Sequence, residues 1–157
     1  CAMLGVKTLL FKQFPDQEFE TAYRHIQITV EAAIKDIQPE AVYTHHTGDL
    51  NLDHQIIAKT VLVATRPVPG CSVKDVYMCE VPSSTEWGFA YQFKPNVFVD
   101  VTETLHEKLD AMACYVSEMK DYPHPRSLEM LAFTMHARGT IVGAEYAEAF
   151  ELVRSIR

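Results

Sequence analysis

The chain has 157 residues, of which 48% are hydrophobic and 22% are charged, and its formal net charge is −7. This length and composition are typical of a single globular domain, here residues 1–157, that can bury a sizeable core. The 14 Lys and Arg residues are scattered along an acidic chain, which argues against a nucleic-acid partner. No apolar segment reaches the roughly 20 residues of a membrane span, so we expect no membrane span.

Four cysteines lie among apolar neighbours without C-x-x-C spacing. This pattern is typical of reduced thiols in a cytoplasmic protein, and the N-terminus shows no signal-peptide pattern.

Residues 1–5 read as the last turn of a helix that Gly5 caps. A domain rarely begins at the end of a helix, and the chain has no initiator Met. We therefore expect an N-terminally incomplete domain, the C-terminal portion of a longer protein.

Strand and helix patterns then alternate along the chain. Residues 6–12 predict a strand, residues 17–37 an amphipathic helix that ends before Pro39, and residues 41–45 a β-branched strand. Residues 52–66 are apolar nearly all round, as in a buried helix, with Asn51 as the N-cap.

The second half is less regular. Strands are predicted over residues 73–81 and 96–101, helices after Thr102 and Ser127, and a short strand or extended arm over residues 146–156. The helix after Thr102 is expected to bury a face that includes Leu105, Leu109, Met112, Val116 and Met119. The alternation predicts an α/β fold, namely a three-layer α/β/α Rossmann-like domain with a mostly parallel sheet that includes residues 6–12 and 41–45.

The most informative segment is residues 43–54, which hold three of the seven histidines and two aspartates between a strand and a helix. In open α/β sheets, ligands collect outside the carboxyl ends of strands, so this loop is a candidate metal or acid–base site. His54 falls in the first helical turn, where the helix dipole keeps an imidazole neutral, and Asp53 beside it could orient the ring. Without further information, a histidine at a helix start is more often a capping or surface residue. His45 should point away from His46 and be structural.

A resemblance to the PIG-L/LmbE family of zinc-dependent de-N-acetylases is carried by the motif His45-His46-x-Gly48-Asp49-Leu50-Asn51-x-Asp53-His54. Three later segments follow in the order of the sugar-acting bacterial branch, namely Ser83-Ser84-Thr85-Glu86-Trp87, residues 93–102, and Pro123-His124-Pro125-Arg126-Ser127 with residues 143–150. The family begins with a strand that ends in His-Pro-Asp-Asp, which supplies two zinc ligands and the general base. That motif does not occur in this chain.

The resemblance implies a role for each matching residue. His54 takes the position of the third zinc ligand, with iron as an alternative metal, and Asp53 supports it. Asn51 occupies a position where many members carry a histidine, and it can donate a hydrogen bond but cannot act as an acid. His46 and His124 are candidate replacements for that histidine. The expected substrate-binding residues are His46, Asp49, Trp87 and Arg126. An ordinary solvated loop histidine and a surface arginine are interpretations that fit His124 and Arg126 at least as well.

Two functions remain open. The first is a metal-dependent hydrolase that removes an acetyl group from a small-molecule N-acetylated amino sugar or its conjugate, of which this chain is an inactive piece. The second is a non-catalytic α/β binding or scaffold domain derived from the same family. In either case, we expect an unpaired sheet edge to favour association, including formation of a homo-oligomer.

Overall fold

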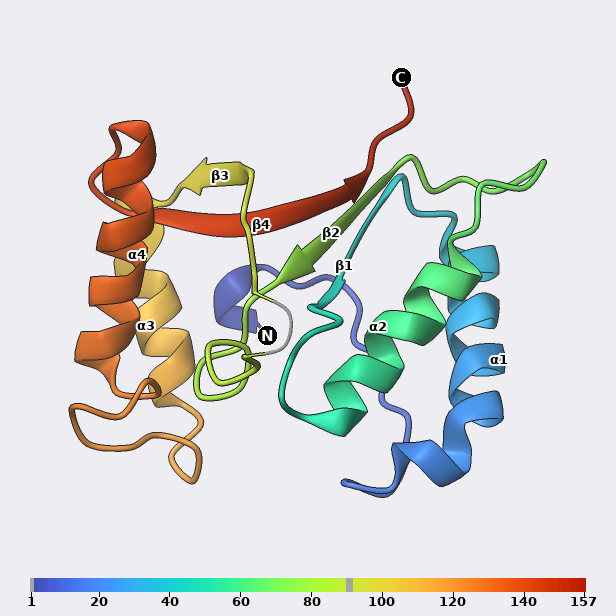
Figure 1. The fold of residues 1–157 in the computed structure, drawn as a ribbon, viewed down its shortest axis with the longest axis horizontal. Helices are drawn as coiled ribbons and strands as arrows, with labels where there is room; N and C mark the ends of the chain where they lie inside the picture. The colour runs from blue at the N-terminus through green and yellow to red at the C-terminus, as the bar shows by residue number, and fades with distance from the viewer. Residues whose placement is uncertain (1, 90–91) are drawn as a thin grey trace. The chain divides into compact units, whose positions relative to one another are not determined.

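The computed structural model describes residues 2–89 and 92–157. Cys1, one of the four cysteines considered above, lies outside the described residues. In chain order the elements are η1 (Ala2–Leu4), α1 (Phe19–Ile37), β1 (Ala41–His45), α2 (Leu52–Ala64), β2 (Asp75–Cys79), β3 (Val97–Asp100), η2 (Thr102–Thr104), α3 (Leu105–Ala113), α4 (Leu128–Val142) and β4 (Ala147–Arg154) (Figure 1).

The four strands form one sheet in the order β1-β2-β4-β3. β1 and β2 are parallel, in a register that runs from Ala41 opposite Asp75 to His45 opposite Cys79. β2 and β4 are antiparallel, with an irregularity between Val76 and Tyr77. The predicted α/β class is therefore confirmed, and so is the parallel strand 41–45, whereas the sheet as a whole is mixed.

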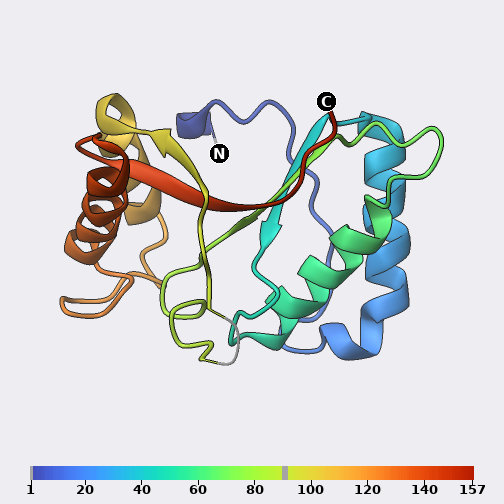
Figure 2. The same cartoon turned by 45° about the horizontal axis from the view of Figure 1, so that its top comes forward.

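The chain divides into two compact units, and β4 contributes to both. The unit formed by Gln13–Asn96 and Phe150–Arg157 contains α1, β1, α2 and β2. In this unit, α1 and α2 lie side by side (Figure 2) and α2 packs against β1. Ile26 of α1 and Ile56, Ala58 and Val61 of α2 are buried. The apolar residues that predicted these two helices therefore form the core of this unit.

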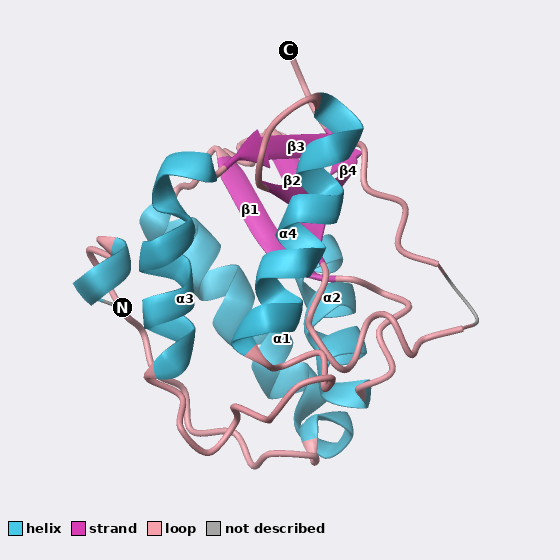
Figure 3. Cartoon of the chain, turned by 90° about the vertical axis from the view of Figure 1, so that its left-hand side faces the viewer, coloured by secondary structure: helices cyan, strands magenta, loops and turns pink. Residues whose placement is uncertain are grey.

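The unit formed by Cys1–Lys12 and Val97–Ala149 contains α3 and α4, which pack together (Figure 3). Its core is a cluster of Leu105, Leu131 and Met135. Gly139 allows the chain after α4 to approach the helix, since a Cβ at this position would lie 2.6 Å from the backbone oxygen of Ala144. No helix among the described residues is long and apolar enough to cross a membrane.

The structure corrects the prediction of a strand over residues 6–12. This segment has no regular secondary structure, and its side chains are exposed, with 82% of Phe11 accessible. β-Branched and aromatic residues favour an extended backbone, but a strand also needs a hydrogen-bonded neighbour. Among the described residues, no strand pairs with this segment.

Two helix boundaries also differ from the prediction. α1 begins at Phe19 rather than at Gln17, because Gln17 has a left-handed backbone with φ 62°. α3 ends at Ala113, so Val116, which was expected on its buried face, is 81% exposed.

Candidate active site

Two loops leave the carboxyl ends of the neighbouring strands β1 and β2. The first loop, residues 46–51, joins β1 to α2, and the second begins after Cys79 and carries residues 83–89. Because β1 and β2 are parallel, both loops start at the same edge of the sheet. This is the edge at which α/β sheets usually bind ligands.

Asn51 begins α2 as its N-cap, as its sequence position predicts. Its Oδ1 accepts hydrogen bonds from the backbone N–H groups of Asp53 and His54, at 2.8 and 3.4 Å. Two of the otherwise unpaired donors of the first turn are thereby satisfied. The cap fixes the direction in which the next residues leave the loop, and it engages the side-chain oxygen of Asn51 while leaving its amide N–H₂ to donate.

His54 is paired with Asp49. Its Nδ1 lies 3.1 Å from Oδ1 of Asp49, whose side chain is fully buried. A carboxylate only accepts hydrogen bonds, so Nδ1 of a neutral His54 carries the proton and Nε2 retains its lone pair. The imidazole is partly exposed. A neutral His54 therefore offers an accessible lone pair on Nε2, which a metal-binding histidine needs.

Asp53 does not support His54, contrary to the prediction. Its Oδ2 accepts the backbone N–H of Gln17 at 2.7 Å, and its Oδ1 accepts that of Phe19 at 3.2 Å. Asp53 thus caps α1, for which Glu18 supplies no side-chain hydrogen bond. Adjacent residues of a helix do not face each other, which explains why Asp53 and His54 serve different neighbours.

His45 was expected to point away from His46 and to have a structural role. Its ring stacks on that of His54, with centroids 4.2 Å apart and planes 11° from parallel. Burial, and then the neighbouring His54, lower the pKa of His45 to about 4, although the charge of Asp49 opposes this shift. His45 is therefore neutral in the physiological range. Its buried Nδ1 has no hydrogen-bond partner among the described residues.

His46 lies on the other side of the loop and is buried, with 4% of its surface accessible. Its Nδ1 accepts the N–H of Gly48, its Nε2 lies 3.6 Å from the carboxylate of Glu151, and the ring of Phe93 packs edge-on against it. This burial is at odds with the substrate-binding and acid roles expected of His46. Its contacts instead fix the conformation of the loop.

Asp49 was expected to bind substrate, but its carboxylate connects the two loops. It accepts hydrogen bonds from the hydroxyls of Ser84 and Thr85 and from the backbone N–H of Asn51. Burial raises the pKa of Asp49, but these hydrogen bonds, together with His54, outweigh burial and lower it. Asp49 is thus ionised at neutral pH. The roles of Ser84 and Thr85 were missed, although the resemblance had drawn attention to their segment.

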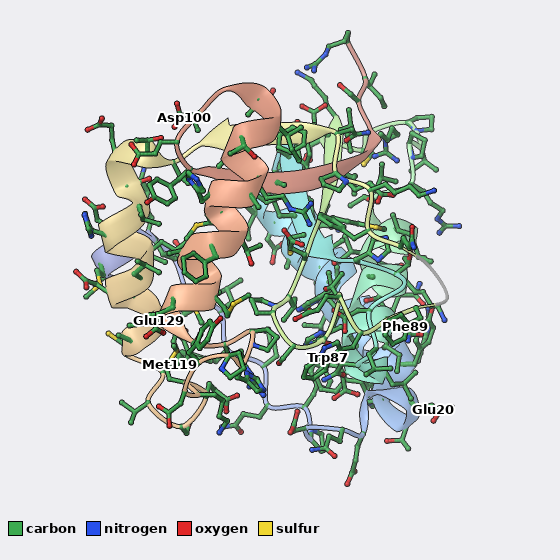
Figure 4. The ribbon with its side chains drawn as sticks, turned by 60° about the vertical axis from the view of Figure 1, so that its left-hand side comes forward. Glu20, Trp87, Phe89, Asp100, Met119 and Glu129 are labelled. Carbon is green, nitrogen blue, oxygen red and sulfur yellow. The ribbon has the colours of Figure 1, made fainter. Side chains whose placement is uncertain are left out.

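The second loop carries two exposed aromatic rings. Trp87 is 42% exposed and Phe89 is 87% exposed, and they lie two and four residues after Thr85 in the same loop (Figure 4). Gly88 between them allows the loops to approach, since a Cβ there would lie 2.0 Å from the backbone oxygen of Gly48. Trp87 therefore has the exposure that contact with a substrate requires.

His124 and Arg126 belong to the unit that contains α3 and α4. The N–H of Arg126 donates to Nδ1 of His124 within a tight turn, and the guanidinium of Arg126 is ion-paired with Glu118. This pairing competes with the anion-binding role expected of Arg126.

Among the described residues of the site, His54 offers a metal one ligand. Within residues 2–89 and 92–157, no group of three or more His, Cys, Asp or Glu residues is arranged to hold a metal ion. The stacked rings of His45 and His54 are parallel, so they do not direct their in-plane lone pairs at one shared ion. Because Nδ1 of His54 faces the carboxylate of Asp49, Nε2 is the atom that would bind a metal ion.

Comparison with solved structures identifies the same fold in three proteins. N,N'-Diacetylchitobiose deacetylase from Pyrococcus horikoshii matches with a TM-score of 0.72 and 19% identity, over 98% of this chain and 60% of its own. The conserved protein TT1542 from Thermus thermophilus matches with a TM-score of 0.76 and 16% identity, over 99% of this chain and 70% of its own. GalB, the 4-carboxy-2-hydroxymuconate hydratase from Pseudomonas putida, matches with a TM-score of 0.65 and 19% identity, over 85% of this chain and 60% of its own.

This chain thus spans 60 to 70% of the length of these three proteins. At these identities, the matches show a shared fold. In sequence, the model of the PIG-L family, described as GlcNAc-PI de-N-acetylase, matches residues 1–65, a range that includes the whole first loop. The resemblance to the PIG-L family that the motif of residues 45–54 predicts is therefore confirmed over residues 1–65.

Proposed function

We propose that this chain is part of a metal-dependent hydrolase that removes the acetyl group from an N-acetylated amino sugar or its conjugate. The observation that carries the proposal is the pairing of His54 with the buried Asp49 at the carboxyl edge of the sheet, inside the segment that matches the PIG-L family. The fold shared with a diacetylchitobiose deacetylase supports an amino-sugar substrate.

His54 would hold the metal through Nε2, with zinc as the expected ion and iron as the alternative. When bound, such an ion supplies a water of lowered pKa and polarises the carbonyl that is attacked. Asn51, whose side-chain oxygen is fixed by the helix cap, would donate from its amide N–H₂ to the oxyanion that forms during amide hydrolysis. Trp87 would stack on the apolar face of a sugar ring.

A catalytic zinc usually has three protein ligands and an open position for water. The described residues supply one ligand, so we propose that the isolated chain binds metal weakly and is inactive. The remaining ligands and the general base would come from residues outside this chain.

The test is an acetate-release assay with a panel of N-acetylated mono- and disaccharides. Both the 157-residue chain and the full-length product of its gene are assayed with zinc, with iron and with a chelator. His54→Ala should abolish the metal-dependent activity of the full-length protein, whereas His106→Ala, at an exposed position of α3, should leave it unchanged. Full activity of the His54→Ala protein would refute the proposal.

The second candidate is a non-catalytic binding domain, which is favoured by the incomplete metal site among the described residues. Metal stoichiometry of the purified full-length protein separates the two functions, since the catalytic proposal requires about one ion per chain.

We further propose a cytoplasmic location and self-association. Cys71 and Cys114 are thiols rather than disulfides, which suits a reducing compartment. Among the described residues, β1 is the strand at one edge of the sheet, and an edge strand favours association. Light scattering of the purified chain tests self-association.

A further inference from the structure

The carboxylate of Asp49 is the point at which the two loops of the site meet. Its side chain is fully buried and receives hydrogen bonds from four separate groups. Two come from its own side of the site, namely the backbone N–H of Asn51 at 2.8 Å and Nδ1 of His54 at 3.1 Å. The other two are the hydroxyls of Ser84 and Thr85, which lie 35 and 36 residues further along the chain.

The contact between Asp49 and His54 determines which nitrogen of the His54 ring keeps a lone pair. A neutral imidazole has one N–H and one lone pair, and an acceptor beside one nitrogen draws the proton to it. Because the carboxylate of Asp49 is buried and accepts from three other donors as well, it acts as an acceptor beside Nδ1. Nε2, the other nitrogen, is therefore kept as a lone-pair donor.

The contacts with Ser84 and Thr85 determine where the second loop lies. The backbone N–H of Leu50 also donates to the oxygen of Ser84 at 3.2 Å, so the loops are joined by backbone as well as side chain. Thr85 Oγ1 further accepts the N–H of Val81 at 2.7 Å, which ties the hydroxyl to the start of the second loop. Trp87 follows two residues later, on the segment held by these bonds.

No Lys or Arg among the described residues is recorded in contact with Asp49, so hydrogen bonds alone satisfy its charge. A buried carboxylate is costly unless it is fully hydrogen-bonded. The four donors therefore depend on one another, because loss of the carboxylate leaves each of them without its acceptor.

We propose that Asp49 is a positioning residue that acts on both sides of the site: it holds the proton of His54 on Nδ1 and fixes the loop that carries Trp87. The importance of His54 for catalysis rests on the function proposed above, whereas the two positioning effects are properties of this chain. Asp49 replaces Asp53 as the partner of His54, and it acts through other residues rather than by touching substrate.

The first experiment determines the tautomer of His54 by long-range ¹H–¹⁵N NMR of the ¹⁵N-labelled chain, at a pH where the imidazole is neutral. The unsubstituted chain should carry the proton on Nδ1. Asp49→Ala should shift the population to the Nε2–H form. Asp49→Asn, which keeps the size of the side chain, is the second variant and should lower the Nδ1–H population if Asp49→Ala does not fold. A proton on Nε2 in the unsubstituted chain, or an unchanged tautomer in a folded Asp49→Ala chain, would overturn the proposal.

The second experiment uses Trp87, the one tryptophan of the chain, as a reporter of the loop. Ser84→Ala removes a hydroxyl from Asp49 without touching His54, so acrylamide quenching of Trp87 should increase while the tautomer of His54 stays the same. Asp49→Ala should change both readouts. Asp53→Asn, the matched control one residue before His54, should change neither. Equal quenching of Trp87 in all four chains would overturn the assignment to the loop.

A zinc titration of the full-length protein connects these effects to the proposed function. Loss of an outer partner of a metal-binding histidine typically weakens metal binding by about 10- to 100-fold, so Asp49→Ala should do so and Asp53→Asn should not. If the unsubstituted protein binds no zinc, the proposed function fails, but the tautomer and quenching results still decide the role of Asp49.

Discussion

The carboxylate of Asp53, in the first turn of α2, lies 2.7 Å from the backbone nitrogen of Gln17, and it also accepts the N–H of Phe19 at the start of α1. The N-termini of the two packed helices are therefore connected through one buried side chain. Asp53→Ala should lower the free energy of unfolding by about 1–3 kcal/mol, because two N–H groups lose their acceptor. Chemical denaturation followed by circular dichroism measures the change. An effect below about 0.5 kcal/mol, the range of ordinary surface substitutions, would contradict this role.

The end of α1 offers a stabilising substitution. Gln38 has φ 50° and ψ 52°, and its N–H donates to the oxygen of Ile34 in a left-handed C-cap. A side chain in this region costs about 1–2 kcal/mol relative to glycine, so Gln38→Gly should raise the melting temperature. Gln27→Gly, in the middle of the same helix, should lower it, since glycine in a helix interior costs about 1 kcal/mol. Scanning calorimetry of both chains tests the sign, and a decrease for Gln38→Gly would refute the cap argument.

The sequence predicts the helices of this chain well where residues that are close in sequence determine them. The three- and four-residue spacing of apolar side chains predicts α1, and Asn51 predicts the start of α2, because helical hydrogen bonds and caps join residues that are close in sequence. Residues 6–12 were wrongly predicted as a strand because strand formation depends on a partner that their own sequence does not reveal.

The contacts within residues 45–54 could be predicted only in part. The alternation along β1 predicts that His45 and His46 face different neighbours, and the ring of His45 lies against His54 while that of His46 packs against Phe93. The partner of His54 was predicted wrongly, because it is Asp49, whereas Asp53 caps α1. Asp53 is adjacent to His54 in sequence, but the contact runs from Asp49 across the turn, and its hydroxyl donors come from a loop that only the pairing of β1 with β2 brings close.

The close approach of the two loops predicts the effect of a methyl group at Gly88. An alanine Cβ there would meet the backbone oxygen of Gly48, which cannot move as a flexible side chain can. Gly88→Ala should destabilise the unit by about 1–3 kcal/mol and should increase the exposure of Trp87 to quencher. Gly5→Ala is a control for glycine substitution without a clash, since nothing lies within 4 Å of the added Cβ. Because Gly5 has a left-handed backbone, Gly5→Ala should affect local stability, but it should leave the quenching of Trp87 unchanged.

The last prediction separates the two roles of Asn51. Its Oδ1 caps α2, while its amide N–H₂ is the group proposed to bind the oxyanion. Asn51→Asp keeps an oxygen for the cap and replaces the amide donor with an acceptor, so stability should change by less than about 0.5 kcal/mol. Removal of one oxyanion donor typically lowers kcat by about 10²- to 10³-fold, and we expect a loss of this size in the full-length protein without a matching rise in KM.

Asn51→Ala completes the comparison. It removes both groups, so it should lower kcat to a similar extent and should also destabilise the helix by about 1 kcal/mol. Thermal unfolding and steady-state kinetics on the same preparations give the two quantities. Because the cap depends only on the oxygen and the proposed catalytic contact only on the N–H₂, stability and kcat must change independently across the two variants. An Asn51→Asp protein with unchanged kcat would remove Asn51 from the catalytic site, while the assignment of the cap would stand.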